Sequence, residues 1–276
     1  MVSAIRIAGT ARARRASRGR GASRARGTSS VALQAAAERR LREQVSACTL
    51  MLNDLGILGY SGHVSARLPG PDALLIQSFD QSRAALSPRD LLTCDFDGRR
   101  VAGPAALRPP SEVYIHTEIY RSRPDVSAVA HFHYDIATVF TLVDGVPLRP
   151  IKNHAVRWAG GIPVHPDPGH ISDRTLGRAA ARSLGPHHAL LIRAHGQVVT
   201  AESVPALFID CVHFAENADA MYRAASLGSV IPLTADEITR FLRDFDRGRH
   251  IYKLWKYYVG RAKAKGLLPA AWRLEA

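Results

Sequence analysis

The sequence predicts an α/β fold in which helices flank a mainly antiparallel or mixed sheet. Long segments with apolar residues at helical spacing occur in both halves of the chain, and short apolar segments bounded by Gly or Pro lie between them. These segments do not alternate as strict βαβ units, which argues against an all-parallel sheet. A chain of 276 residues with 46% hydrophobic content is long enough for one large core. We therefore expect one main domain over residues 31–276.

The first predicted element is an amphipathic helix over about 31–58, ended by Gly56 and Gly59. Residues 61–67 and 73–76 then show the pattern of paired strands. Later, Ser111 is the predicted N-cap of a helix that stops before Pro124. The remaining predicted elements are a strand at 126–133, a helix at 172–184, strands at 189–192 and 197–200, a long helix at 202–227 and two helical stretches within 235–265.

The net charge of +13 is concentrated at the N-terminus, where residues 1–30 carry eight arginines and no acidic residue. The rest of the chain has 29 basic and 24 acidic residues, an ordinary balance for a domain with anionic ligands. Residues 1–30 lack apolar periodicity, so we expect a disordered tail, and any attraction to nucleic acid or membrane would lie there. Its composition also resembles an organelle transit peptide; a dispensable extension or a later start codon are the alternatives.

The sequence lacks the patterns of a membrane protein, a secreted protein and a cysteine-based metal or disulfide framework. No segment approaches the roughly 20 apolar residues of a membrane span, and no signal-peptide core is present, so we expect a cytoplasmic protein. Cys48, Cys94 and Cys211 lack the spacing of a zinc ribbon or a disulfide framework and are expected to be buried hydrophobes.

His131 and His133 lie two residues apart in a predicted strand, so both imidazoles project from the same face and can reach one divalent ion. The alternative is that the two histidines are ordinary surface or core residues that bind no metal. His195 ends an apolar strand before Gly196 and is the third candidate ligand, or else a simple strand cap. Three histidines would leave an open coordination position, as in a catalytic site.

Glu112 and His116 lie four residues apart on a predicted helix and therefore share a face. A carboxylate and an imidazole beside a metal are suited to proton transfer, and Glu112 is alternatively a fourth metal ligand. A solvated pair on the helix surface is the competing interpretation.

Four motifs together resemble the class II aldolase/adducin family over about residues 38–230. They are SGHVSAR at 61–67, PSE at 110–112 with His116 following, SRPD at 122–125 leading to AHFH at 130–133, and AHG at 194–196. The resemblance implies a three-layer αβα fold around a mainly antiparallel sheet and a homotetramer with active sites at subunit interfaces. It also implies a metal on His131, His133 and His195, with Glu112 as acid/base or displaceable ligand.

The sequence departs from the family's sugar-phosphate aldolases at the positions that bind phosphate. Those enzymes use a Gly-Asn pair, a Thr-Gly turn and a Ser-Ser pair, where this chain has Gly62-His63, no Thr-Gly in residues 77–80, and Pro110-Ser111. The position of their interface tyrosine acid falls on His154. Small donors that would cradle a phosphate are largely missing.

Gly-His in the first motif and Asn-His-Ala at 153–155 resemble the aromatic-acid decarboxylase branch of the family. The resemblance implies a lyase acting on a dihydroxyphthalate-type acid or a carboxy-hydroxymuconate semialdehyde, with His116 or His154 as proton donor. His63, Ser65, Arg67 and Ser111 are the candidate substrate-binding residues. Zinc is the expected metal, with manganese, iron or cobalt as alternatives. An aldolase of a hydroxy-carbonyl or sugar-phosphate substrate and a non-catalytic adducin-like module are the alternative functions.

Overall fold

The computed structural model describes residues 19–70 and 72–275, and the chain divides into two units, Met1–Glu38 and Arg39–Ala276. Helix α1 (Gly19–Asp54) begins in the first unit, so residues 19–30 are helical where the sequence predicted disorder. Alanine and arginine are strong helix formers, and a missing apolar face prevents core burial without preventing a helix. Residues 1–18 of the predicted tail lie outside the described residues, and the division into tail and catalytic domain stays a prediction.

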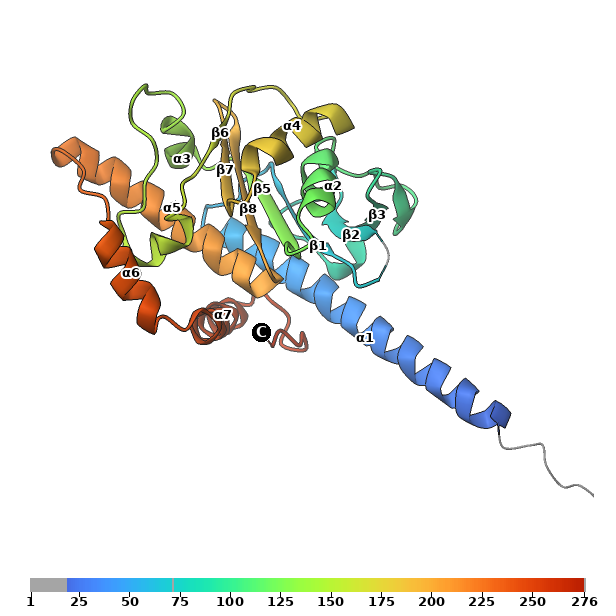
Figure 1. Cartoon of the computed structure of the whole chain (residues 1–276). Helices are drawn as coiled ribbons and strands as arrows, with labels where there is room; N and C mark the ends of the chain where they lie inside the picture. Colours follow the sequence, from blue (N-terminus) through green and yellow to red (C-terminus); the bar gives the residue numbers. More distant parts are fainter. Residues whose placement is uncertain (1–18, 71, 276) are drawn as a thin grey trace, which may run out of the picture. The chain divides into compact units, whose positions relative to one another are not determined.

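The second unit is built on one eight-stranded sheet with the strand order β4-β3-β2-β1-β5-β8-β7-β6 (Figure 1). Neighbouring strands are antiparallel except for β6 and β7, which confirms the predicted mainly antiparallel sheet. The strands are β1 (His63–Arg67), β2 (Ala73–Gln77), β3 (Leu91–Asp95), β4 (Arg100–Ala102), β5 (Ala128–Phe132), β6 (Val164–His165), β7 (Ala189–Ile192) and β8 (Gly196–Ala201).

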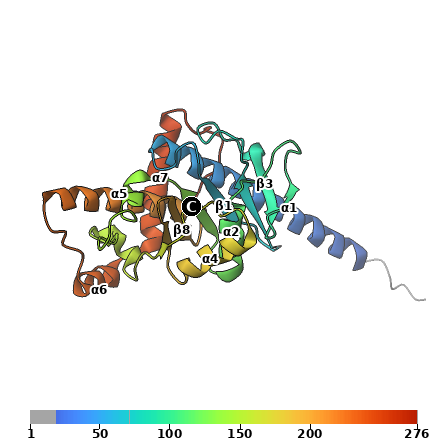
Figure 2. The same ribbon diagram turned by 90° about the horizontal axis from the view of Figure 1, so that it is seen from above.

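Helices cover both faces of the sheet, as a three-layer αβα fold requires (Figures 1 and 2). Apolar residues of α2 (Val113–Ser122) and α4 (Arg174–Leu184) share a core with alternate residues of the strands on one face. The part of α1 within the second unit and α5 (Val204–Leu227) cover the other face. Because side chains alternate along a strand, Val64 and Ala66 join the α1/α5 core, while His63 and Ser65 face α2.

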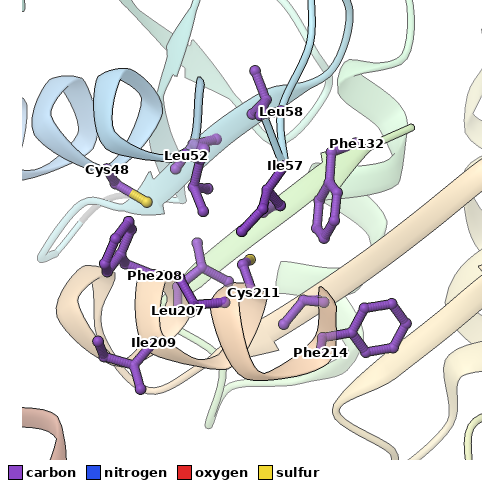
Figure 3. Packing of buried hydrophobic residues seen from close by; sticks show 14 of the residues in the cluster. Cys48, Leu52, Ile57, Leu58, Phe132, Leu207, Phe208, Ile209, Cys211 and Phe214 are labelled. Atoms are coloured by element: carbon purple, nitrogen blue, oxygen red, sulfur yellow. The ribbon is translucent and has the colours of Figure 1, made fainter. Parts of the chain in front are cut away.

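The core between α1 and α5 consists of buried apolar side chains. Figure 3 shows Cys48 and Leu52 of α1 with Leu207 and Cys211 of α5 and Phe132 of β5. All three cysteines are buried free thiols, as the sequence predicted.

The C-terminal helices extend this side of the molecule. Helix α7 (Arg247–Ala264) packs on α5, where Trp255 lies edge-on to Phe208, and α6 (Ala235–Asp244) precedes it. Arg247 forms a two-pronged ion pair with the buried Asp210 of α5, at 2.9 and 2.8 Å. Trp255 is therefore a packing residue. None of the helices in the described ranges is both long and apolar enough to cross a bilayer.

Shorter elements connect these layers. They are η1 (Pro88–Asp90), α3 (Asp135–Val139) and η2 (Asn153–Trp158).

Candidate metal centre and active site

The three candidate histidine ligands come from two neighbouring parts of the sheet. His131 lies on β5 opposite His63 of β1 and Val198 of β8. His133 follows the end of β5, and His195 lies in the turn between β7 and β8. Because β5 and β8 are paired, the strand end and the turn meet at one edge of the sheet.

Two glycines leave the space that this arrangement needs. A Cβ on Gly62 would lie 2.6 Å from the carbonyl oxygen of His131, and Gly62 has a φ of +95°, which other residues rarely adopt. A Cβ on Gly196 would lie 2.6 Å from both Cδ2 of His133 and the carbonyl oxygen of Phe132. A side chain at position 196 would therefore displace the His133 ring.

The four predicted metal ligands converge. Nε2 of His133 lies 3.1 Å from Nε2 of His131. The Glu112 carboxylate places Oε2 3.4 Å from Nε2 of His131 and Oε1 3.6 Å from Nε2 of His195. One ligand atom from each of the four residues lies within 4.8 Å of the other three. The sequence motifs thus identified four side chains that the fold brings together.

These separations fit a single divalent ion. Zn–N bonds of about 2.0–2.1 Å place two ligands of a tetrahedral ion about 3.3 Å apart, close to the separations in this cluster. Nδ1 of His131 lies 3.0 Å from the carbonyl oxygen of Gln197, and donation to this oxygen leaves the lone pair on Nε2 facing the other ligands. Three imidazoles and a carboxylate suit zinc, manganese, iron or cobalt.

Glu112 itself occupies the N-cap position of α2, where the sequence predicted Ser111. Its side chain makes no capping bond, because Oε1 accepts a hydrogen bond from the amide of Ile171 at 3.0 Å and Oε2 faces His131. Burial alone would raise the pKa of Glu112, but His131, the Ile171 amide and His195 lower it to about 2. The carboxylate is therefore ionised and available as a ligand.

His116 lies behind the site, fully buried, in a chain of hydrogen bonds. Its Nδ1 is 2.6 Å from Oγ of Ser65, which is in turn 2.8 Å from the hydroxyl of Tyr120. Its Nε2 is 2.7 Å from Nδ1 of His63. Burial lowers the pKa of His116 to about 3, and burial followed by the neighbouring imidazoles lowers that of His63.

A cavity of about 370 Å³ opens beside the four ligands. Its lining includes four of the predicted site residues, namely His63, Ser111, Glu112 and His133. His116 and Ser65 do not line it and reach it only through His63. Of these two predicted site residues, His63 lies at the cavity wall and His116 does not.

Arg67 lies at the junction of α2 and β5. Its guanidinium donates to the carbonyl oxygens of Tyr120, Arg123 and Val126, and it lies over the Tyr120 ring, 4.9 Å from its centroid. These contacts use the side chain to join backbone segments, whereas the sequence suggested a substrate-binding role.

His154 lies on η2 in a different cluster. Its Nε2 is 3.3 Å from Oε2 of Glu216, and its ring stacks on His213 at 4.2 Å between centroids. These three residues also gather their ligand atoms within 4.8 Å, but the two imidazole rings are inclined by only 24°. Nearly parallel rings do not direct their lone pairs at one ion. Within one chain, the fold does not bring His154 to the Glu112 cluster.

Two basic residues of the cavity wall, Arg83 and His170, were not identified as site residues from the sequence. Arg83 follows β2 in a segment without periodicity, and His170 stacks on His195 at 5.7 Å between ring centroids. A short turn at 167–170 was the only local signal for His170, and none existed for Arg83. Both reach the cavity through tertiary folding.

Comparison with known proteins agrees with this geometry. Residues 42–222 match the profile of the Class II Aldolase and Adducin N-terminal domain. The chain is 31% identical over 216 residues to a 3,4-dihydroxyphthalate decarboxylase of Rhodococcus jostii, covering 74% of this chain and 88% of that protein. It is also 31% identical over 188 residues to a 5-methylthioribulose-1-phosphate/5-deoxyribulose-1-phosphate aldolase of Rhodospirillum rubrum, covering 68% and 82% respectively.

The fold has a similar match among solved structures. An aldolase II superfamily protein from Pseudomonas syringae aligns with a TM-score of 0.74 at 22% identity, over 84% of this chain and 95% of that one. Sequence profile, relatives and fold agree with the family that the four motifs resemble. The chain belongs to the class II aldolase and adducin family.

Proposed function

We propose that this protein is a divalent-metal-dependent carbon–carbon lyase that decarboxylates a hydroxylated aromatic acid or a carboxy-hydroxymuconate semialdehyde. The observation that carries the proposal is the convergence of His131, His133, His195 and Glu112, two of which, His133 and Glu112, line a cavity together with His63. Support also comes from relatives of this chain, since three of them are 3,4-dihydroxyphthalate decarboxylases with 26–31% identity.

The four ligands would hold the ion so that part of its coordination sphere is open to the cavity. The ion would bind vicinal oxygens of the substrate and stabilise the negative charge that develops when the carbon–carbon bond breaks. His131 is oriented for this by Gln197, and Glu112 by the Ile171 amide. Glu112 would act as a ligand or, if displaced by substrate, as a base beside it.

His63 would carry the proton. Its Nδ1 is engaged by His116, so Nε2 is the ring nitrogen left for the cavity. The imidazole is neutral before substrate binds, because burial and the neighbouring rings lower its pKa. It can therefore accept the proton that a substrate hydroxyl loses on binding, and the anionic substrate then stabilises the imidazolium.

The same proton completes the reaction. Transfer from His63 to the ring carbon that bears the carboxylate forms a C–H bond and removes aromaticity. The bond to the carboxyl carbon then breaks, its electron pair returns to the ring, and CO2 leaves. His116, held by Ser65, would keep the His63 ring oriented through both transfers. No outside acid or oxidant is needed.

An aldolase acting on a hydroxy-carbonyl or sugar-phosphate substrate is the second candidate. Two observations favour it, namely the aldolase relative from Rhodospirillum rubrum and the cationic Arg83 at the cavity, which phosphate would also suit. Aldol cleavage needs the same electron sink and differs in its leaving group. A non-catalytic adducin-like module would not need the four convergent ligand side chains.

We also propose a homotetramer in which His154 serves the site of a neighbouring subunit. Subunit complementation tests this directly. His154→Ala and Glu112→Ala proteins, each inactive alone, should regain activity when refolded together, because some mixed sites then carry both intact residues. Equal inactivity before and after mixing would remove His154 from the reaction.

The reaction is tested on the metal-loaded protein with a panel of ortho-hydroxy aromatic acids, including 3,4-dihydroxyphthalate, while CO2 and products are measured. Ribulose- and fuculose-phosphate-type substrates form the second arm. His133→Ala should lose both the metal and the activity, with His187→Ala as the matched control that keeps both. Efficient cleavage of a sugar phosphate with every aromatic acid untouched would establish the aldolase instead.

A further inference from the structure

Arg83 is a buried cation in the wall of the cavity. It lies in the segment between β2 and η1, and only 8% of the residue is exposed. The same cavity is lined by His63 and Glu112, so the guanidinium and the ligand cluster face a common volume. A site of about 370 Å³ lies at the small end of ligand cavities and suits one substituted ring.

The guanidinium is fixed by backbone oxygens through Nε and Nη1. Nε donates to the carbonyl oxygen of Gly62 at 3.0 Å, and Nη1 donates to that of Phe79 at 3.1 Å. Nη1 also contacts the carbonyl oxygens of Ser78 and Gln81. Among the described residues, Nη2 has no hydrogen-bond acceptor, so two N–H groups remain for a ligand.

Burial lowers the pKa of Arg83, and the charge of nearby Asp80 offsets this only in part. No carboxylate of the described ranges lies within ion-pair distance of its guanidinium, and the neighbouring Asp80 is paired with Arg108 at 3.5 Å. Arginine stays protonated when buried, and burying an unpaired charge is costly unless a counterion arrives.

We propose that Arg83 binds an anionic group of the substrate that stays on the product, and that this group is a carboxylate. The proposal rests on the proposed lyase function and defines its substrate class as acids with a second carboxylate besides the one that leaves. Holding the departing carboxylate would oppose the reaction, because that group loses its charge as CO2 forms. Holding a retained carboxylate orients the ring at no such cost.

Binding of unreactive probes to the metal-loaded enzyme tests this without turnover. Calorimetry would compare 3,4-dihydroxybenzoate with catechol and with 3,4-dihydroxybenzamide, which has the same shape and no charge. The benzoate should bind about 10–100-fold more tightly than either, as expected for one charge-assisted hydrogen-bonded pair. Equal affinities for benzoate and amide, or no binding of the benzoate, would overturn the proposal.

Variants then locate the effect. Arg83→Gln should abolish the preference for the benzoate while catechol affinity and metal content stay the same, and Arg83→Lys should restore part of it. Arg108→Gln, which removes a nearby exposed arginine, should keep the preference. A preference that survives in Arg83→Gln would place the anion site elsewhere. If Arg83→Gln fails to fold, the benzoate and amide comparison on the native protein still decides.

Two further results separate this inference from the proposed function. An Arg83-dependent preference for the benzoate without decarboxylation of any acid would retain the carboxylate site and reject the reaction. If acids with one carboxylate are decarboxylated as fast as acids with two, the proposed reaction is retained and the carboxylate site at Arg83 is rejected. Tighter Arg83-dependent binding of ribulose 1-phosphate than of the benzoate would show a phosphate site and overturn the choice of carboxylate.

Discussion

Nδ1 of His63 lies 2.7 Å from Nε2 of His116, and both rings are buried. The two imidazoles cannot both be charged at this distance, and the low pKa values of both rings agree with a neutral pair. Of the two, only His63 lines the cavity, whereas His116 extends the hydrogen-bond chain to Ser65. In the proposed reaction, His63 would therefore touch the substrate and His116 would orient His63.

Substitutions along the hydrogen-bond chain from His63 to Tyr120 should lower activity by an amount that decreases with distance from the cavity. His63→Ala should reduce kcat by about 10²–10⁴-fold, because it removes the proton carrier. His116→Phe should reduce kcat by about 10–100-fold with little change in KM, as expected for a partner that orients a reacting group. Tyr120→Phe, at the far end, should have the smallest effect. Metal content should be unchanged in all three, and an unimpaired His116→Phe enzyme with a normal pH profile would contradict the scheme.

Gly196→Ala should weaken metal binding. The added Cβ would lie 2.6 Å from the His133 ring and from the Phe132 carbonyl oxygen, so a metal ligand or the strand end must move. Metal affinity measured by competition with a chelator should fall together with the thermal midpoint. Gly260→Ala is the matched control, since its Cβ meets nothing within 4 Å in α7, and it should raise stability by about 0.5–1 kcal/mol. Equal metal affinity in both variants would refute the steric explanation.

The protein should lose stability as the pH falls below about 6.5. Burial lowers the pKa of His213 to about 3, and it also lowers the pKa values of His154 and His250. Because the unfolded chain binds these protons first, the stability contribution is complete above the unfolded pKa and is lost on acidification. Each histidine contributes at most about 1.4 kcal/mol per pH unit. Urea unfolding at pH 7.5, 6.5 and 5.5 measures the slope.

The charges around this cluster make His213 the informative position. Lys152 and Arg247 add to the lowering of its pKa, whereas Glu216 acts in the opposite direction on His154. His213→Gln should therefore flatten the pH dependence without affecting the metal ligands. An unchanged slope in this variant would show that other groups control acid stability.

Deleting residues 1–30 should leave turnover and metal content unchanged while lowering the pI. All residues of the candidate site belong to the second unit, which begins at Arg39. Steady-state kinetics of the truncated and full-length proteins would measure this, with deletion of residues 1–18 as the milder comparison. A large loss of turnover would mean that the basic segment contributes to the reaction.

Local patterns were sufficient to predict the parts of the site that lie in regular structure. Apolar strand patterns lead to His131 and to His195, and these patterns, with Gly196 after the second, indicated where the two imidazoles lie. Their role as metal ligands stays a prediction. The mainly antiparallel sheet followed from strands without regular crossover helices.

Residues whose role depends on tertiary contacts were not predictable in this way. Arg83 is defined by carbonyl oxygens in two loops, and Arg67 by the ends of α2 and β5. An isolated arginine in the sequence does not reveal which oxygens surround it. The short strand β6 was also missed, because two residues carry no periodicity and pair with β7 only in the folded chain.

The pairing of His63 with His131 across β1 and β5 restricts how this enzyme can change during evolution. A shift of one residue in that register would turn the proposed proton carrier and a proposed metal ligand to the opposite face together. Phe79, Arg83, Pro110 and Ser111 line the same cavity and belong to no strand, so they can vary without changing that register. The residues proposed to carry out the chemistry depend on the pairing of the strands, whereas single substitutions in the loops of the cavity wall could change substrate preference.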